Sequence, residues 1–145
     1  RRELSARELL AATLERIDEL NPTLNAVITL VPEMAEAWAA VADEGTPTIV
    51  TEDPDGDERV TKLWVVVVDG EGLIRTGNSR WFRNIERDPN VEFWIGGHSY
   101  PLRAELVTDE SVKERAGEAF REKYGWMDIP FSNPDDNVLR LLPRE

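Results

Sequence analysis

The spacing of apolar residues separates a helical first part of the chain from a strand-rich remainder. Leucine and isoleucine recur every three or four residues after Ser5 and Glu8, which form a capping-box sequence, and this pattern predicts an amphipathic helix over Ser5–Leu20 that ends at Asn21-Pro22. An alanine-rich run predicts a second helix over Glu33–Ala42. Because a helix as short as the first is marginal alone, we expect its apolar face to pack on the rest of the protein or on a second subunit.

Beyond residue 47, short apolar runs are separated by clusters of Asp, Gly, Pro and Asn, a pattern typical of antiparallel strands joined by turns. A helix is expected from an Asp109 cap to about Tyr124. These features predict an α+β protein with a helical leader over residues 1–45 and a β-barrel domain over residues 46–145, with a helix in the C-terminal half. The expected strands are Thr48–Thr51, Val60–Val68, Leu73–Thr76, Val91–Ile95, Tyr100–Val107 and Val138–Leu142.

The composition limits the possible chemistry. The chain has 145 residues, 41% of them hydrophobic, so it is one domain long and can bury a real core. It has no cysteine, which excludes disulfides, a thiol nucleophile and Cys-ligated metal sites, and His98 is the only histidine, so we expect no metal site. No apolar run approaches the roughly 20 residues that span a bilayer. We therefore expect a soluble, cytoplasmic protein without a membrane partner.

Charge is distributed unevenly along the chain. The formal net charge of −12 argues against a nucleic-acid partner, because phosphate contacts need a basic face. Residues 1–58 contain 4 Lys/Arg against 14 Asp/Glu, and residues 101–145 contain 7 against 10, whereas residues 59–100 contain 6 against 5. The middle segment is thus the most favourable place for an anion, although strands also carry fewer charges than solvated helices for purely structural reasons.

Within this middle segment, two predicted strands deliver polar side chains to the point where a helix should begin. Arg75, Thr76, Ser79 and Arg80 are residue types that bind phosphate, since Arg supplies a fork of donors and Ser and Thr add hydroxyls. The start of a helix adds unpaired N–H groups and a positive dipole end. These residues indicate an anionic ligand, but they could equally be strand-end residues that form ordinary surface ion pairs.

The order strand, turn, strand, Ser-Arg, helix, Asp-Pro-Asn, strand resembles the split β-barrel flavoproteins, namely the pyridoxamine 5′-phosphate oxidase-like superfamily and its deazaflavin-dependent nitroreductase relatives. The resemblance covers about residues 48–144 and is closest to a small branch of unassigned function. It implies a split antiparallel β-barrel with Greek-key order and about six strands, and a homodimer with the cofactor at its interface. The matching residues are Trp64–Val68, Arg75, Arg80–Asn84, Gly96-Gly97, Phe120–Gly125 and Leu139–Arg144.

The same resemblance implies an FMN or F420 cofactor. In the superfamily, Ser-Arg-Lys after the second strand holds the FMN phosphate, and here Trp81 takes the third position, which leaves the choice of flavin open. Lys62 lies where the superfamily places a basic residue, although an exposed Lys at a strand start is equally common. Trp81 and Trp94 could stack on the flavin ring or pack in a core or interface. The expected cofactor-binding residues are Lys62, Arg75, Thr76, Ser79, Arg80 and Trp81.

The expected cofactor-binding residues and the resemblance leave two possible functions. The first is an oxidoreductase in which the protein holds the cofactor phosphate and positions the ring, while the flavin or deazaflavin transfers hydride to or from a small-molecule substrate. No catalytic side chain is assigned. The second is a non-enzymatic barrel that binds a flavin or another phosphorylated ligand.

The first part of the chain carries a different resemblance. The segment Leu4–Glu33, LSARELLAATLERIDELNPTLNAVITLVPE, resembles the N-terminal segment of amidase-signature hydrolases. Catalysis in that family needs a Lys and two Ser in a Gly/Ser-rich core, and no Lys precedes Lys62 here. We therefore interpret the leader as a borrowed or fused scaffold element that does not carry amidase chemistry.

Overall fold

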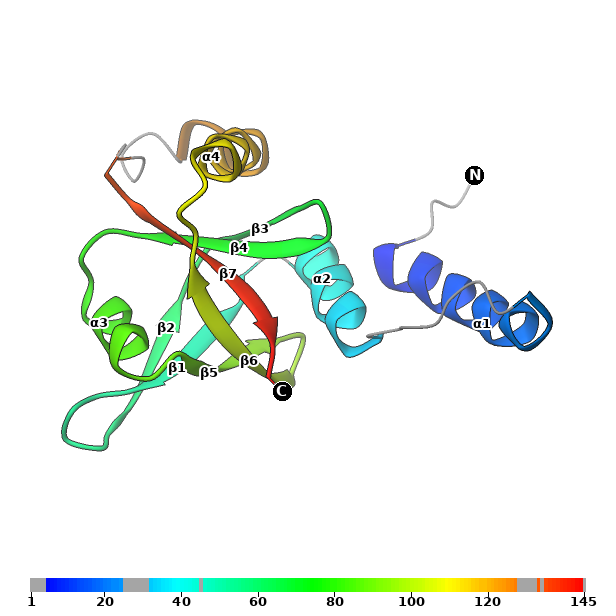
Figure 1. Cartoon of the computed structure of the whole chain (residues 1–145), viewed down its shortest axis with the longest axis horizontal. Helices are drawn as coiled ribbons and strands as arrows, with labels where there is room; N and C mark the ends of the chain where they lie inside the picture. Colours follow the sequence, from blue (N-terminus) through cyan, green and yellow to red (C-terminus); the bar gives the residue numbers. More distant parts are fainter. Residues whose placement is uncertain (1–4, 25–31, 45, 128–132, 134, 145) are drawn as a thin grey trace.

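The computed structural model describes residues 5–24, 32–44, 46–127, 133 and 135–144. Seven antiparallel strands form one curled sheet in the order β2-β1-β5-β6-β7-β4-β3; α2, α3 and α4 pack on it, and α1 lies beside α2 (Figure 1). This arrangement confirms the α+β half-barrel expected from the sequence. The elements are α1 (Ala6–Leu24), α2 (Pro32–Glu44), β1 (Thr48–Glu52), β2 (Glu58–Lys62), β3 (Val65–Val68), β4 (Glu71–Thr76), α3 (Arg80–Arg87), β5 (Asn90–Ile95), β6 (His98–Leu106), α4 (Glu110–Tyr124) and β7 (Asn137–Pro143).

The sheet is split between two strands that are neighbours in sequence. β2 and β3 lie at its opposite edges, and only Leu63 and Trp64 connect them. The single strand expected over Val60–Val68 is therefore wrong, because the chain leaves one edge at Lys62 and joins the other at Val65. The run contains no Gly or Pro to mark the crossing, and Leu63 is instead anchored by donating its N–H to the Pro47 carbonyl at 3.1 Å.

The first helix is longer than expected and lies away from the sheet. α1 continues through Asn21-Pro22 to Leu24, so the proline does not end the helix, although it removes one N–H donor and crowds the carbonyl four residues before it. It packs along α2, and the N–H groups of Ala6 and Arg7 donate to the Asp43 carboxylate at 3.0 and 3.1 Å (Figure 1). Its apolar face is only half-buried, as shown by Leu10, Leu14 and Ile17.

The second helix forms part of the barrel core. α2 confirms the helix expected over Glu33–Ala42, and it buries Trp38 and Val41 in the same cluster as Phe93 of β5. The Trp38 indole meets the Phe93 ring edge-on at 5.7 Å, and it lies so close to Gly72 of β4 that an added Cβ would come within 2.2 Å of it. The division of the chain at residue 45 stays a prediction. α2 lies before this division, but its buried side chains pack in the core of the barrel that follows it.

The third and fourth helices begin where the sequence indicates. The Ser79 hydroxyl accepts a hydrogen bond from the Phe82 N–H and caps α3, and the Asp109 carboxylate accepts from the Ser111 N–H and caps α4. α4 packs on β3 and buries Phe120 in a second core cluster with Leu73 and neighbouring residues (Figure 1). Among the described helices, none combines the length and apolar content that crossing a bilayer requires.

Candidate functional site

A cavity of about 340 Å³ opens where the chain crosses from β2 to β3. This volume lies within the range of small-molecule sites. Its walls come from both core clusters, so that two cations and a hydroxyl lie beside three aromatic rings. The lining residues are Lys62, Leu63, Trp64, Arg75, Thr76, Trp81 and Phe120.

Hydroxyl groups fix the wall of the cavity between β4 and α3. The Thr76 Oγ1 donates to Ser79 Oγ at 2.8 Å, and Ser79 Oγ also accepts from the Phe82 N–H at 3.2 Å. These two bonds hold the helix start against the strand end, and neither uses the O–H of Ser79, which is the part of the hydroxyl that could donate to an anion. The turn therefore keeps Thr76 and Trp81 on the same cavity wall.

Arg75 forms the charged base of the cavity. Its Nε lies 3.7 Å from Asp136 Oδ2, and the two side chains are only 10% and 11% exposed. The guanidinium also lies over the Phe120 ring, 4.6 Å from its centroid. A cation packed between a carboxylate and an aromatic face is held in one orientation.

The structure brings together most of the residues that the sequence indicates. Lys62, Arg75, Thr76 and Trp81 line the cavity, and Ser79 supports it through Thr76. Arg80 does not line the cavity. It is exposed in the first turn of α3, and its positive charge contributes to lowering the pKa of Asp53, behind the hydrogen bonds that Asp53 accepts from Arg59 and Asn84.

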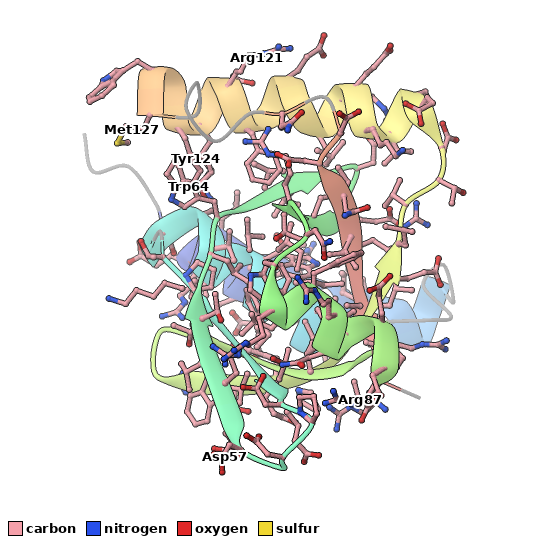
Figure 2. All side chains as sticks on the ribbon, turned by 90° about the vertical axis from the view of Figure 1, so that its left-hand side faces the viewer. Asp57, Trp64, Arg87, Arg121, Tyr124 and Met127 are labelled. Atoms are coloured by element: carbon pink, nitrogen blue, oxygen red, sulfur yellow. The ribbon has the colours of Figure 1, made fainter. Side chains whose placement is uncertain are left out.

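Trp94, the other candidate for ring stacking, lies elsewhere. It is on β5, 43% exposed, and does not line the cavity. The aromatic surface comes instead from Trp64 and Phe120, which the sequence analysis did not assign to the site. Trp64 stacks on Tyr124 with ring centroids 4.4 Å apart and planes 10° apart, and the two lie side by side beneath α4 (Figure 2).

A polar network supports α3 on the side of the β1–β2 hairpin. The Asn84 Nδ2 donates to Thr51 Oγ1 at 3.1 Å and to Asp53 Oδ1 at 2.7 Å, although Asn84 is only 2% exposed. Arg59 donates to both oxygens of Asp53. These bonds, first from Arg59 and then from Asn84, hold the pKa of the Asp53 carboxyl well below its usual range. The β1–β2 hairpin is thus tied to the helix that borders the cavity.

Solved structures with the same fold confirm the split barrel. A conserved hypothetical protein from Mycobacterium tuberculosis is 28% identical, with a TM-score of 0.64 over 83% of this chain and 84% of its own. A candidate pyridoxamine 5′-phosphate oxidase from Listeria innocua is 17% identical, with a TM-score of 0.61 over 77% and 94%. A heme storage protein from Vibrio cholerae is 19% identical, with a TM-score of 0.61 over 81% and 92%. The predicted resemblance to the split-barrel superfamily is therefore confirmed.

The resemblance to amidases is confirmed as well, but only for part of those proteins. The chain is 55% identical over 144 residues to a glutamyl-tRNA(Gln) amidotransferase subunit of Granulibacter bethesdensis, a match that covers 96% of this chain and 27% of the relative. It thus spans about a quarter of the length of that curated relative. The model of the family described as "Uncharacterized protein conserved in bacteria (DUF2255)" matches residues 38–134, which are 97 of the 145 residues, and the chain belongs to this family.

Proposed function

We propose that this chain is a cytoplasmic, flavin-type cofactor-binding barrel that acts as an FMN- or F420-dependent oxidoreductase on a small-molecule substrate. One observation carries the proposal. Four of the six residues assigned to the cofactor from sequence, namely Lys62, Arg75, Thr76 and Trp81, come from three different elements and line one cavity. Lys62 reaches this cavity from a different element than the other three residues, which supports a shared ligand.

The chemistry of the lining fits a ligand with a planar ring and an anionic group. Trp81 and Phe120 supply apolar faces on which a ring can pack, and Lys62 is an exposed cation at the cavity. The proton of Thr76 is donated to Ser79, so the hydroxyl donor for an anion at this turn is that of Ser79. α3 points its positive dipole end toward the same wall, with Arg80 in its first turn. A bound flavin or deazaflavin would supply hydride transfer, and these side chains would bind and orient it.

A non-enzymatic ligand-binding barrel is the second candidate function. One of the similar structures is described as a heme storage protein, so a heme ligand is the most specific form of this alternative. The cavity gives it less support than it gives a flavin, because none of the residues lining it is a His, Cys, Met or Tyr, and the single His98 lies in the β5–β6 turn. Those residue types are the usual iron ligands of heme proteins.

Spectroscopy tests the proposal directly. Purified protein reconstituted with FMN or F420 should retain the cofactor absorbance after gel filtration, and for an enzyme that absorbance should bleach with a reduced nicotinamide. Reconstitution with heme but with neither flavin would favour the storage alternative. Retention of FMN without any turnover would favour a binding protein over an oxidoreductase.

Matched variants test the site itself. Lys62→Ala and Arg80→Ala should each weaken FMN binding by about tenfold or more, since a hydrogen bond to a charged group contributes about 1.5–3 kcal/mol. Arg121→Ala makes the same charge change on the exposed side of α4 and should bind FMN normally (Figure 2). A Lys62→Ala curve equal to that of Arg121→Ala would contradict the assignment of this cavity. An Arg80→Ala curve equal to that of Arg121→Ala would contradict a phosphate site at the start of α3, where Arg80 lies outside the cavity.

A further inference from the structure

Arg75 is paired with a carboxylate that comes from the loop before β7. Asp136 Oδ2 lies 3.7 Å from Arg75 Nε, and both side chains are about nine-tenths buried. Attraction between opposite charges is strong in such a poorly solvated place. The positive charge at the base of the cavity is therefore balanced by the chain itself.

The position of this carboxylate is fixed by its own turn. The Asp136 N–H donates to the Asn133 carbonyl at 3.0 Å, and the Asn133 N–H donates back to Asp136 Oδ2 at 3.2 Å. The other oxygen, Oδ1, lies 3.5 Å from where a Cβ on Gly77 would be. The carboxylate thus borders the same β4–α3 turn that carries Thr76 and Ser79, where a ligand phosphate would approach Arg75.

Two anions cannot share this place without repulsion. We propose that Asp136, which does not line the cavity, sets its ligand specificity through Arg75, because it offsets the charge of Arg75 and so withholds that cation from a ligand phosphate. This inference rests on the proposed flavin site. Its consequence is that discrimination between phosphorylated and unphosphorylated ligands depends on Lys62 and Arg80, and that the base of the cavity accepts an uncharged part of the ligand.

FMN and riboflavin differ only in the phosphate, so the ratio of their affinities measures this selectivity. Asp136→Asn removes the negative charge and keeps the size of the side chain. It should raise the affinity for FMN by about tenfold, the scale of one charge-assisted contact, while riboflavin affinity changes by less than about twofold. Asp135→Asn removes the same charge from the exposed neighbouring residue and should leave the ratio unchanged.

A second variant keeps the inference testable if Asp136→Asn does not fold, since removing one partner of a buried ion pair is strongly destabilising. Arg75→Gln combined with Asp136→Asn removes both charges together, a change that buried pairs often tolerate. Its ratio of FMN to riboflavin affinity should match that of the unmodified protein. If Arg75 instead held the phosphate in the unmodified protein, this double variant would lose about tenfold of FMN affinity.

The outcomes separate the inference from the function on which it rests. If the unmodified protein binds both flavins but Asp136→Asn shows an equal or lower ratio, or the double variant loses FMN affinity, the role given to Asp136 is overturned while the flavin site stands. If neither flavin binds to any variant, the proposed function fails and this inference fails with it. If Asp136→Asn binds FMN tightly and the other variants do not, this result would support both the proposed flavin site and the role of Asp136.

Discussion

The Tyr124 hydroxyl pairs with both backbone groups of Val65, accepting from its N–H at 3.1 Å and donating to its carbonyl at 3.0 Å. β3 is an edge strand, so the backbone groups on its outer side have no neighbouring strand to pair with. Lys123 Nζ adds a second hydrogen bond to the same carbonyl at 2.9 Å. Burial lowers the pKa of the Lys123 ammonium and raises that of the Tyr124 phenol. The C-terminal end of α4 therefore closes this edge of the sheet, next to the cavity residue Trp64.

Tyr124→Phe should weaken this closure without disturbing the ring stacked on Trp64. Loss of the hydroxyl leaves the Val65 N–H without its partner, and we expect the free energy of unfolding to fall by about 1–3 kcal/mol. Chemical denaturation measures this change, and hydrogen exchange at the Val65 amide reports the hydrogen bond itself. Unchanged protection of that amide would show that the Tyr124 hydroxyl does not pair with it in solution.

The close approach of Trp38 to Gly72 leads to a second prediction, which tests whether α2 is part of the barrel core. In Gly72→Ala the new methyl group would overlap the indole, and we expect a loss of about 1–3 kcal/mol of stability from overpacking. Gly117→Ala is the matched control. It lies inside α4 with no atom within 4 Å of the added Cβ, so it should gain about 0.5–1 kcal/mol from helix propensity. Equal stability of Gly72→Ala and the unmodified protein would mean that Trp38 does not pack on β4.

Local patterns predict much of this fold because each of them has a local cause. The caps Ser79 and Asp109 lie where the sequence indicates, since a side chain that pairs with an N–H two or three residues ahead needs nothing from the rest of the molecule. The crossing at Leu63-Trp64 could not be recognised in this way. An apolar run that leaves one sheet edge and joins the other has the same pattern as a single buried strand.

The site shows the same limit. Thr76 and Trp81 were predictable because they lie within a few residues of one turn, beside Arg75 and the Ser79-Arg80 pair. Phe120 lines the cavity from α4, Asp136 reaches Arg75 from the loop before β7, and neither has a sequence feature that points to Arg75. Contacts between residues more than forty positions apart depend on the tertiary fold, which periodicity and turn residues do not specify.

The hydrogen bonds at Asp53 predict a specific pH dependence. Its pKa is lower in the folded protein than in the unfolded chain, so the stabilisation is fully present above the unfolded value of about 3.9 and is lost as the pH falls toward the folded value. Asp53→Asn should be less stable than the unmodified protein at pH 7, and the difference should shrink below about pH 4. Urea unfolding across this pH range measures it.

Asp57→Asn, at the exposed tip of the same hairpin, is the control for the change in charge (Figure 2). A gap between Asp53→Asn and the unmodified protein that stays constant from neutral to acidic pH would contradict the prediction. In that case the Arg59 and Asn84 hydrogen bonds would stabilise the charged and neutral carboxyl equally.

We expect the interface of the homodimer to lie on the outer face of the sheet. Thr48 of β1 is paired with Lys62 on one side and Trp94 on the other, and Val50 is paired with Val60, so all of these side chains share one face. Val60 is 65% exposed and Trp94 43%. Because Lys62 also lines the cavity, a second subunit on this face would lie beside the proposed cofactor site.

We therefore expect light scattering at micromolar concentration to give a dimer mass for the unmodified protein. Val60→Glu combined with Trp94→Glu should shift that mass to a monomer, because two carboxylates would be buried in an apolar interface without partners. The same variant should bind FMN more weakly if the partner subunit completes the site. Leu106→Glu makes a similar change at another exposed apolar residue, 47% exposed at the end of β6, and should leave both mass and binding unchanged. A monomer mass for the unmodified protein would contradict the proposed dimer, whereas a dimer that survives the double substitution would show that its interface lies on another face.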